Sequence, residues 1–213
     1  SGKKDWDKRA ALRDLIRAEG DTLKNAIIFC NRKKDVSELF RSLVRHEFDA
    51  GALHGDMDQR ARMTMLANFK EGKLRLLVAS DVAARGLDIP DVSHVFNYDI
   101  PQDVDSYIHR IGRTGRAGKH GVSITFVTPN EMGYLRTIEE LTKKRMEPLK
   151  PPTEAEALAG QLASAKEDIV QTIADDDLEK YDDVAEYVQA ITPVPGGVGT
   201  VTTIELLKHT IIS

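Results

Sequence analysis

The stretch 26–53, AIIFCNRKKDVSELFRSLVRHEFDAGAL, contains two short apolar runs joined by an amphipathic helix. We assign the runs to Ala26–Cys30 and Ala50–Leu53 and the helix to Lys34–Arg45. The alternation continues with apolar runs at Leu74–Ala79, Val92–Phe96 and Val122–Val127 and helices at Gln59–Glu71, Val104–Arg110 and Glu131–Arg145. Short apolar strands that alternate with helices predict an α/β fold, with a parallel sheet covered by helices on both faces.

The charge of the 213-residue chain is unevenly distributed around its formal net value of −4. Residues 1–150 hold 27 Lys and Arg against 22 Asp and Glu, whereas residues 151–213 hold 3 against 12. A basic body suits a nucleic acid or phosphate partner, and an acidic tail would be repelled by both. We therefore expect one domain at 1–150, with a boundary at Pro151–Pro152.

Cys30 is the single cysteine, so the chain can form neither an internal disulfide nor a cysteine metal cluster, which fits a reducing cytoplasm. No apolar run approaches the roughly 20 residues that a membrane span needs. We expect a cytoplasmic protein without a membrane partner.

Polar residues follow the first three apolar runs. They are Asn31–Lys33 after the first, His54–Asp56 after the second and Ser80–Asp88 after the third. Ligands of a parallel sheet gather at the carboxyl ends of its strands, so we expect these residues to form a site at one edge.

A basic cluster occupies residues 107–118, YIHRIGRTGRAG, where His109, Arg110, Arg113 and Arg116 alternate with glycines. Like charges three residues apart on a helix repel each other, so the cluster adds little to folding. Arginine matches phosphate oxygens with a planar fork of donors, and glycine lets the backbone approach a ligand. The cluster predicts arginine fingers on a triphosphate; a solvated basic turn is the alternative.

The chain lacks a GxxxxGK[ST] phosphate loop and an Asp-Glu pair after a strand to hold magnesium. Phosphoryl transfer needs the loop, the metal and the finger, and a finger can come from a separate domain. We therefore expect the chain alone to be inactive.

Four motifs resemble, in order and spacing, the second RecA-like domain of a DEAD-box ATP-dependent RNA helicase, most closely the bacterial RhlE type. They are AIIFCNRK at 26–33, HGDMDQRAR at 54–62, FKEGKLRLLVASDVAARGLDIP at 69–90 and YIHRIGRTGRAG at 107–118. The resemblance covers roughly residues 5–150. It implies a RecA-like (P-loop NTPase-type) fold, RNA unwinding by the full protein, and ATP as cofactor, with Mg held by an amino-terminal RecA-like domain that acts as a partner.

The resemblance also implies roles for single residues. Arg113 and Arg116 match the fingers on the γ-phosphate, and His109 and Arg110 match positions that couple the nucleotide to the other domain and to RNA. Asp88 matches the carboxylate that binds the ATP ribose. The catalytic candidates are thus Arg113, Arg116 and His109, and the cofactor-binding candidates are Asp88, Arg110 and Gly86.

The residues for which RNA contacts are implied are Arg32, Gly55, Gln59, Arg62, Ser80, Asp81 and Arg85. Side chains of these types bind phosphate and sugar without reading bases, so we expect little sequence preference. The alternatives are structural: Asp81 could cap a helix, and Arg62 could be a solvated charge.

Residues 151–190 predict an acidic extension of two helices, broken around Asp175–Asp177. The apolar stripe of its first helix consists of Leu158, Leu162, Ile169, Val170 and Ile173. The extension resembles the helical segment that follows this domain in some bacterial DEAD-box proteins. The stripe would pack on the body or, as the alternative, pair two copies in a homodimer.

Residues 191–213, ITPVPGGVGTVTTIELLKHTIIS, resemble the carboxyl-terminal segment of methylenetetrahydrofolate dehydrogenase/cyclohydrolase, in which a glycine-rich loop precedes a helix. Thr200 and Val201 depart from that family's residues, and no GxGxxG fingerprint is present. We predict a graft in a chimeric chain, with a helix at Thr203–Ile212; a natural tail is the alternative. A non-enzymatic scaffold that displays the segment is the alternative to a helicase half.

Overall fold

The sheet is the centre of the computed structural model, which describes the backbone of residues 2–174 and 205–212. Its parallel strands are β1 (Ala26–Cys30), β2 (Ala50–Leu53), β3 (Leu76–Ser80), β4 (His94–Asn97) and β5 (His120–Val127). Two antiparallel strands, β7 (Glu205–Ile212) and β6 (Glu147–Leu149), extend the sheet beyond β5, giving the order β2-β3-β1-β4-β5-β7-β6. The predicted α/β RecA-like fold is confirmed.

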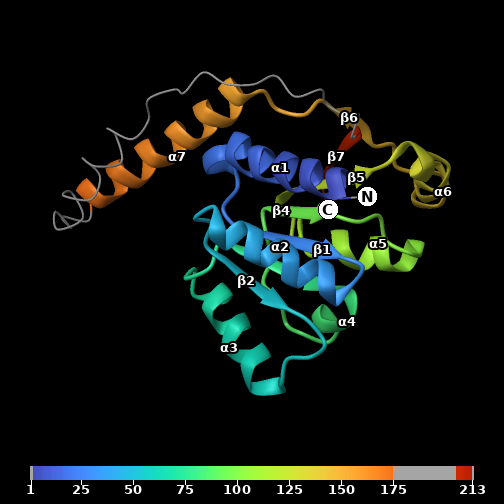
Figure 1. The fold of residues 1–213 in the computed structure, drawn as a ribbon, viewed down its shortest axis with the longest axis horizontal. Helices are drawn as coiled ribbons and strands as arrows, with labels where there is room; N and C mark the ends of the chain where they lie inside the picture. Colours follow the sequence, from blue (N-terminus) through green and yellow to red (C-terminus); the bar gives the residue numbers. More distant parts are fainter. Residues whose placement is uncertain (1, 175–204, 213) are drawn as a thin grey trace.

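The helices cover both faces of the sheet (Figure 1). They are α1 (Gly2–Glu19), α2 (Lys33–Arg45), α3 (Gln59–Lys70), α4 (Asp81–Ala84), α5 (Val104–Ile111), α6 (Met132–Thr142) and α7 (Glu154–Ala174). Successive residues of a strand point to opposite faces, so Ile28 joins the core under α1 and α2 while Ile27 and Phe29 join the core under α3 and α4. Burial on both faces explains why the strands are apolar throughout.

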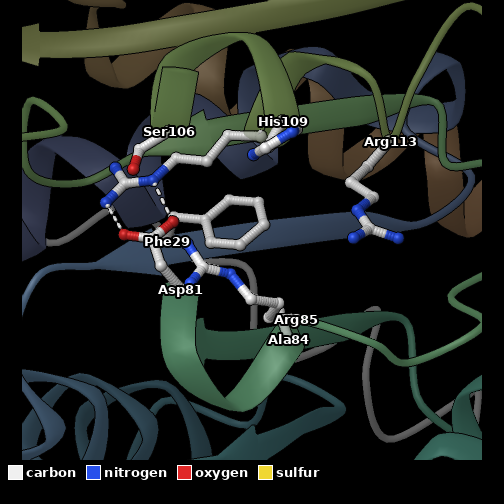
Figure 2. Close-up of a pocket in the computed structure, with 8 residues that line it drawn as sticks. Phe29, Asp81, Ala84, Arg85, Ser106, His109 and Arg113 are labelled. Atoms are coloured by element: carbon white, nitrogen blue, oxygen red, sulfur yellow. Dashed lines mark hydrogen bonds and ion pairs between the residues drawn. The ribbon is translucent and has the colours of Figure 1, made fainter. Parts of the chain in front are cut away.

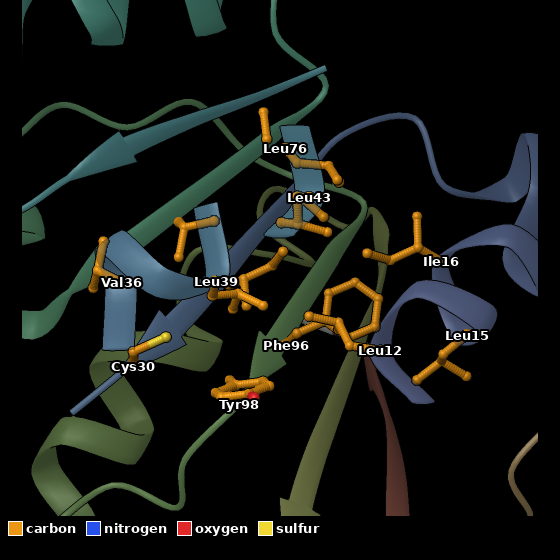
Figure 3. Close-up of a cluster of buried hydrophobic side chains, with 14 of the residues drawn as sticks. Leu12, Leu15, Ile16, Cys30, Val36, Leu39, Leu43, Leu76, Phe96 and Tyr98 are labelled. Carbon is orange, nitrogen blue, oxygen red and sulfur yellow. The ribbon is translucent and has the colours of Figure 1, made fainter. Parts of the chain in front are cut away.

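Figure 3 shows buried side chains of the core under α1 and α2. Leu12 of α1 and Leu39 and Leu43 of α2 lie against Phe96 and Tyr98 of the sheet region, and all five are buried. Both faces of the sheet are closed by apolar side chains, so the ends of the strands are where polar groups can gather.

Helix α7 packs across α1, through small residues rather than through the predicted apolar stripe. Ala157 is buried, and a Cβ atom added at Gly160 would collide with the backbone of Arg17 and Ala18. Leu158 and Leu162 of the stripe, in contrast, are 38% and 45% exposed. The first predicted helix is confirmed, but the expectation that its stripe packs on the body is wrong for these leucines, because close backbone approach places the small face inward. The second predicted helix lies outside the described residues.

The carboxyl-terminal segment forms a strand where the sequence predicted a helix. β7 pairs along the whole of β5, from His120 opposite Ile212 to Val127 opposite Glu205. The edge of β5 offers a row of backbone partners, and the β-branched residues Thr210–Ile212 favour extended backbone. The rest of the predicted graft, residues 191–204 and 213, lies outside the described residues.

Candidate functional site

The sheet order brings the predicted RNA-contact segments together. β2, β3 and β1 are neighbours, so the residues that follow them lie at one edge. Lys33 and Asp56, which come after β1 and β2, form an ion pair with a 3.0 Å Nζ–Oδ1 distance. The guanidinium of Arg62 on α3 donates to the carbonyl oxygen of Ala83 on α4 at 2.7 Å. Arg62 is therefore partly a link between helices, and the two RNA-contact segments share one framework.

The RNA candidates differ in how accessible they are. Arg32, Gly55, Gln59 and Arg85 are exposed. Ser80 is 7% exposed, and its hydroxyl caps α4 by accepting a hydrogen bond from the Ala83 amide. The exposed group can contact a polyanion directly, whereas the Ser80 side chain already serves the framework.

Arg110 is buried at the centre of this edge, with 1% of the residue exposed. Its Nε and Nη2 donate to both carboxylate oxygens of Asp81 at 2.7 and 2.6 Å. Nη2 also donates to Oδ1 of Asn31 at 2.7 Å, Nη1 donates to the carbonyl of Asp99 at 2.8 Å, and the guanidinium lies over the Phe29 ring. Because these bonds hold the guanidinium inside the chain, the geometry favours a positioning role for Arg110 over direct contact with a nucleotide.

A pocket of about 210 Å³ opens between α4 and α5 (Figure 2). Its walls are Phe29, Asp81, Ala84, Arg85, Ser106, His109, Arg110 and Arg113. His109 is exposed at its rim, and the sticks in Figure 2 place His109 and Arg113 on the α5 side and Arg85 on the α4 side. The pocket thus unites candidates from the catalytic, cofactor and RNA groups.

The two predicted fingers lie beside the loop that carries Asp88. Arg113 donates to the carbonyl of Leu87 at 3.4 Å. Arg116 donates through Nε to Gly112 at 2.6 Å and through Nη1 to the carbonyl of Ile89 at 3.5 Å. The fingers and the ribose candidate, which are distant in sequence, therefore share one surface on the α4–α5 side of the sheet.

The electrostatics of this surface suit an anion. Burial and, second, the neighbouring Arg116 lower the pKa of Arg113, whereas Asp88 raises it. Asp88 is 94% exposed and forms an ion pair with Lys70 at 3.1 Å. Gly86 has φ of +75°, with open space where a Cβ would lie. Such donors fit phosphate oxygens, and an exposed carboxylate fits a sugar hydroxyl.

The described residues were also compared with the ligand set that a metal ion such as Mg²⁺ needs. Across residues 2–174 and 205–212, no group of three or more His, Cys, Asp or Glu side chains is placed to hold a metal ion. The donor set therefore fits the phosphates and ribose of a nucleotide better than it fits a metal.

Some residues of the site were not singled out by the sequence. Asn97 accepts from Arg110 and donates to the Thr125 hydroxyl at 3.0 Å. Phe29 and Ser106 line the pocket. Asn31, which also accepts from Arg110, was expected at this edge from its position after a strand. The other three residues could be recognised only in the tertiary arrangement.

Two family models match the chain. The model described as helicase conserved C-terminal domain matches residues 7–118, which is more than half of the chain. The model described as tetrahydrofolate dehydrogenase/cyclohydrolase, NAD(P)-binding domain, matches residues 169–213 and so begins within α7.

Relatives and solved structures agree with the first model. The ATP-dependent RNA helicase CshA of Limosilactobacillus reuteri is 52% identical over 183 residues, covering 86% of this chain and 36% of that protein. E. coli DEAD-box protein SrmB, solved with regulator of ribonuclease activity A, has a TM-score of 0.62 and 37% identity over 72% of this chain and 87% of that one. S. cerevisiae Dbp5 bound to RNA and ADP BeF3 has a TM-score of 0.64 and 35% identity over 75% of this chain and 42% of that one.

The chain spans about a third of the length of the curated relatives it matches. The curated relatives named here are CshA proteins, whereas the sequence resemblance was to the RhlE type. Among the described helices, none is long and apolar enough to cross a bilayer.

Proposed function

Because the chain belongs to the helicase conserved C-terminal domain family, as the C-terminal RecA-like domain of a DEAD-box RNA helicase, we propose that it supplies the arginine fingers of an ATPase site that an amino-terminal RecA-like domain completes. The full protein would couple ATP hydrolysis to RNA unwinding. The observation that carries this proposal is the shared surface of Arg113, Arg116 and the Asp88 loop.

The proposed roles of the residues come from the family resemblance, and their geometry supports them. When bound, ATP with Mg²⁺ supplies the γ-phosphoryl group that passes to water. Arg113 and Arg116 leave the carbonyls of Leu87 and Ile89 and stabilise the charge that develops on the phosphoryl oxygens, a contribution of about 10³- to 10⁵-fold in kcat for arginine fingers. Asp88 accepts a hydrogen bond from the ribose, and Gly86 lets the backbone pass close to the nucleotide.

RNA would bind at the edge formed by the ends of β1, β2 and β3. The exposed side chains of Arg32, Gln59 and Arg85 contact the RNA phosphates. The backbone at Gly55 lies close to the RNA backbone. The Arg110–Asp81 pair joins this edge to α5, which leads into the fingers. His109, at the rim of the pocket, is placed to contact the other domain.

A reconstituted enzyme tests the proposal. The chain is joined to the amino-terminal domain of a DEAD-box relative, and ATP hydrolysis is measured with and without RNA. We expect RNA-stimulated hydrolysis in the joined protein, its loss in Arg113→Ala, and normal activity in the control Arg136→Ala, an exposed arginine on α6. A folded joined protein without hydrolysis would contradict the proposal.

We also propose that the chain alone is inactive, since its sequence has no phosphate loop. The same measurement on the chain alone checks this, and hydrolysis above background would contradict it. We further propose a cytoplasmic location and a homodimer that forms through the carboxyl-terminal helices.

A second proposal concerns the origin of the carboxyl-terminal segment. The folate-enzyme model match at 169–213 favours a chimeric chain in which a foreign segment supplies β7 to the helicase sheet. Residues 1–150 would then be the helicase domain, 151–190 the helical extension and 191–213 the graft. In the scaffold alternative the domain only carries this segment, and the joined enzyme would lack hydrolysis. Titration with NADP tests for retained folate-enzyme function, and we expect no binding.

A further inference from the structure

Hydrogen bonds to Val92 hold the loop that carries Arg113 and Arg116. Thr114 is 2% exposed, and its hydroxyl donates to the carbonyl of Val92. The Val92 amide donates to the carbonyl of Arg113 at 3.0 Å, and Thr114 forms a parallel β-bridge with Val92. Thr114, which follows Arg113 directly in the chain, is therefore fixed on the segment that leads into β4.

Gly121, the second residue of β5, packs closely against Thr114 and Gly115 of the same loop. A Cβ atom added at Gly121 would collide with Oγ1 of Thr114, and it would lie 2.8 Å from Cγ2 of Thr114 and 2.5 Å from the amide nitrogen of Gly115. The φ angle of Gly121 is not in the left-handed region, so backbone conformation does not require glycine there. What requires it is space, because the Gly115 backbone amide cannot rotate away as the end of a long side chain can.

We propose that Gly121, acting through Thr114 and Gly115, is a positioning residue that sets the placement of the two arginine fingers. The inference rests on the proposed function for its catalytic consequence. A side chain at this position would push the finger loop away from β5 and carry Arg113 and Arg116 with it. Displacements of about 1 Å can cost about 10²-fold in rate even when the substitution lies away from the reacting atoms.

The kinetic test uses Gly121→Ala in the joined enzyme. We expect kcat for RNA-stimulated ATP hydrolysis to fall by about 10²-fold, while KM for ATP and the half-saturating RNA concentration change by less than about twofold, because a displaced finger weakens transition-state contacts above all. The matched control is Gly133→Ala on α6, where an added Cβ meets nothing within 4 Å. Equal kcat values for Gly121→Ala and the unsubstituted enzyme would overturn the proposal.

A double substitution tests whether the effect passes through Thr114. Thr114→Ala removes the two side-chain atoms that a Cβ at Gly121 would approach. The combined variant should lose less activity than the product of the two single losses, as expected for coupled neighbours. Strictly multiplicative losses would show that Gly121 does not act through Thr114.

Amide NMR spectra of the chain alone separate failure of this inference from failure of the proposed function. Gly121→Ala should shift the resonances of residues 113–116 while leaving those of residues 54–62 in place. If the joined enzyme is inactive, unshifted finger-loop resonances still overturn the inference. If Gly121→Ala does not fold, Thr114→Val is measured instead, because it keeps the shape and removes the hydroxyl bond to Val92; unchanged loop resonances would again overturn it.

Discussion

The carboxyl end of α5 and the loop that follows it carry the same residue type in opposite circumstances. Arg110, near the end of α5, is 1% exposed and bonded to Asp81, Asn31 and the Asp99 carbonyl. Within the part of the chain that the structure describes, the side chains of Arg113 and Arg116, a few residues later, donate hydrogen bonds only to backbone carbonyls, and two of these three bonds are 3.4 Å or longer. Arginines that belong to one motif thus divide into one that holds the framework and two that remain available.

The difference has a physical basis. A buried charge is costly unless its donors are all bonded, so Arg110 donates to a carboxylate and to three further acceptors. The proposed fingers are less buried than Arg110, and two of their three carbonyl contacts are long, so we expect these contacts to be exchanged for phosphate oxygens at little cost. Substitution at the two places should therefore produce opposite patterns of lost stability and lost activity.

The largest effect is expected from the fingers. Replacing both, as Arg113→Ala with Arg116→Ala, should lower kcat of the joined enzyme by about 10³-fold or more, since arginine fingers contribute at least that much. The free energy of unfolding of the chain, measured in urea, should change by less than about 0.5 kcal/mol, as for most surface substitutions. A large loss of stability with unchanged kcat would mean that Arg113 and Arg116, and not Arg110 alone, hold the framework.

Substitution of Arg110 should give the opposite pattern. Arg110→Leu leaves Asp81 and Asn31 without their partner, and breaking a buried ion pair in this way typically costs about 3 kcal/mol. Urea unfolding of the chain measures the loss, with Arg136→Leu as an exposed control. An unfolding free energy within experimental error of the unsubstituted chain would mean that Arg110 is not part of the framework.

The sequence predicted the sheet well because strands buried on both faces must be apolar throughout. Residue type and spacing alone did not predict that Arg110 is buried and Arg113 is not, since the burial of Arg110 depends on Asp81, which is distant in the chain and adjacent only after folding. It was also wrong about residues 205–212, because a strand is stabilised by pairing with a neighbouring strand, and the pairing with β5 could not be read from the sequence. The predicted individual roles of the site residues stay predictions.

Removal of a single hydrogen-bond acceptor of Arg110 or of Arg116 should give smaller losses of stability that differ in the same direction. Asn31→Leu removes an acceptor of the buried Arg110, and bonds to charged groups contribute about 1.5 to 3 kcal/mol, so we expect a loss near the lower value. Asp91→Ala removes the acceptor of the exposed Arg116 amide and should cost less than about 0.5 kcal/mol. Urea unfolding compares the two. Equal losses would show that burial does not distinguish the two arginines.

The smallest effect concerns the start of α5. The Asp103 carboxylate accepts a hydrogen bond from the Ser106 amide at 2.6 Å, and this bond lowers the pKa of Asp103. Because the folded pKa lies below the unfolded value of about 3.9, the stabilisation is fully present above that value and is lost as pH falls through the folded pKa. Asp103→Asn keeps an amide oxygen as a cap but removes the titration.

Urea midpoints of the chain and of Asp103→Asn should therefore differ at pH 7 and converge as the medium becomes acidic. The effect should appear in unfolding and not in the activity of the joined enzyme at pH 7, because Asp103 supports the helix that holds Arg110 and not the loop that carries the fingers. A difference in midpoints that is constant with pH would mean that the charge of Asp103 does not contribute. A selective loss of kcat in Asp103→Asn would mean that α5 and the finger loop act as one unit.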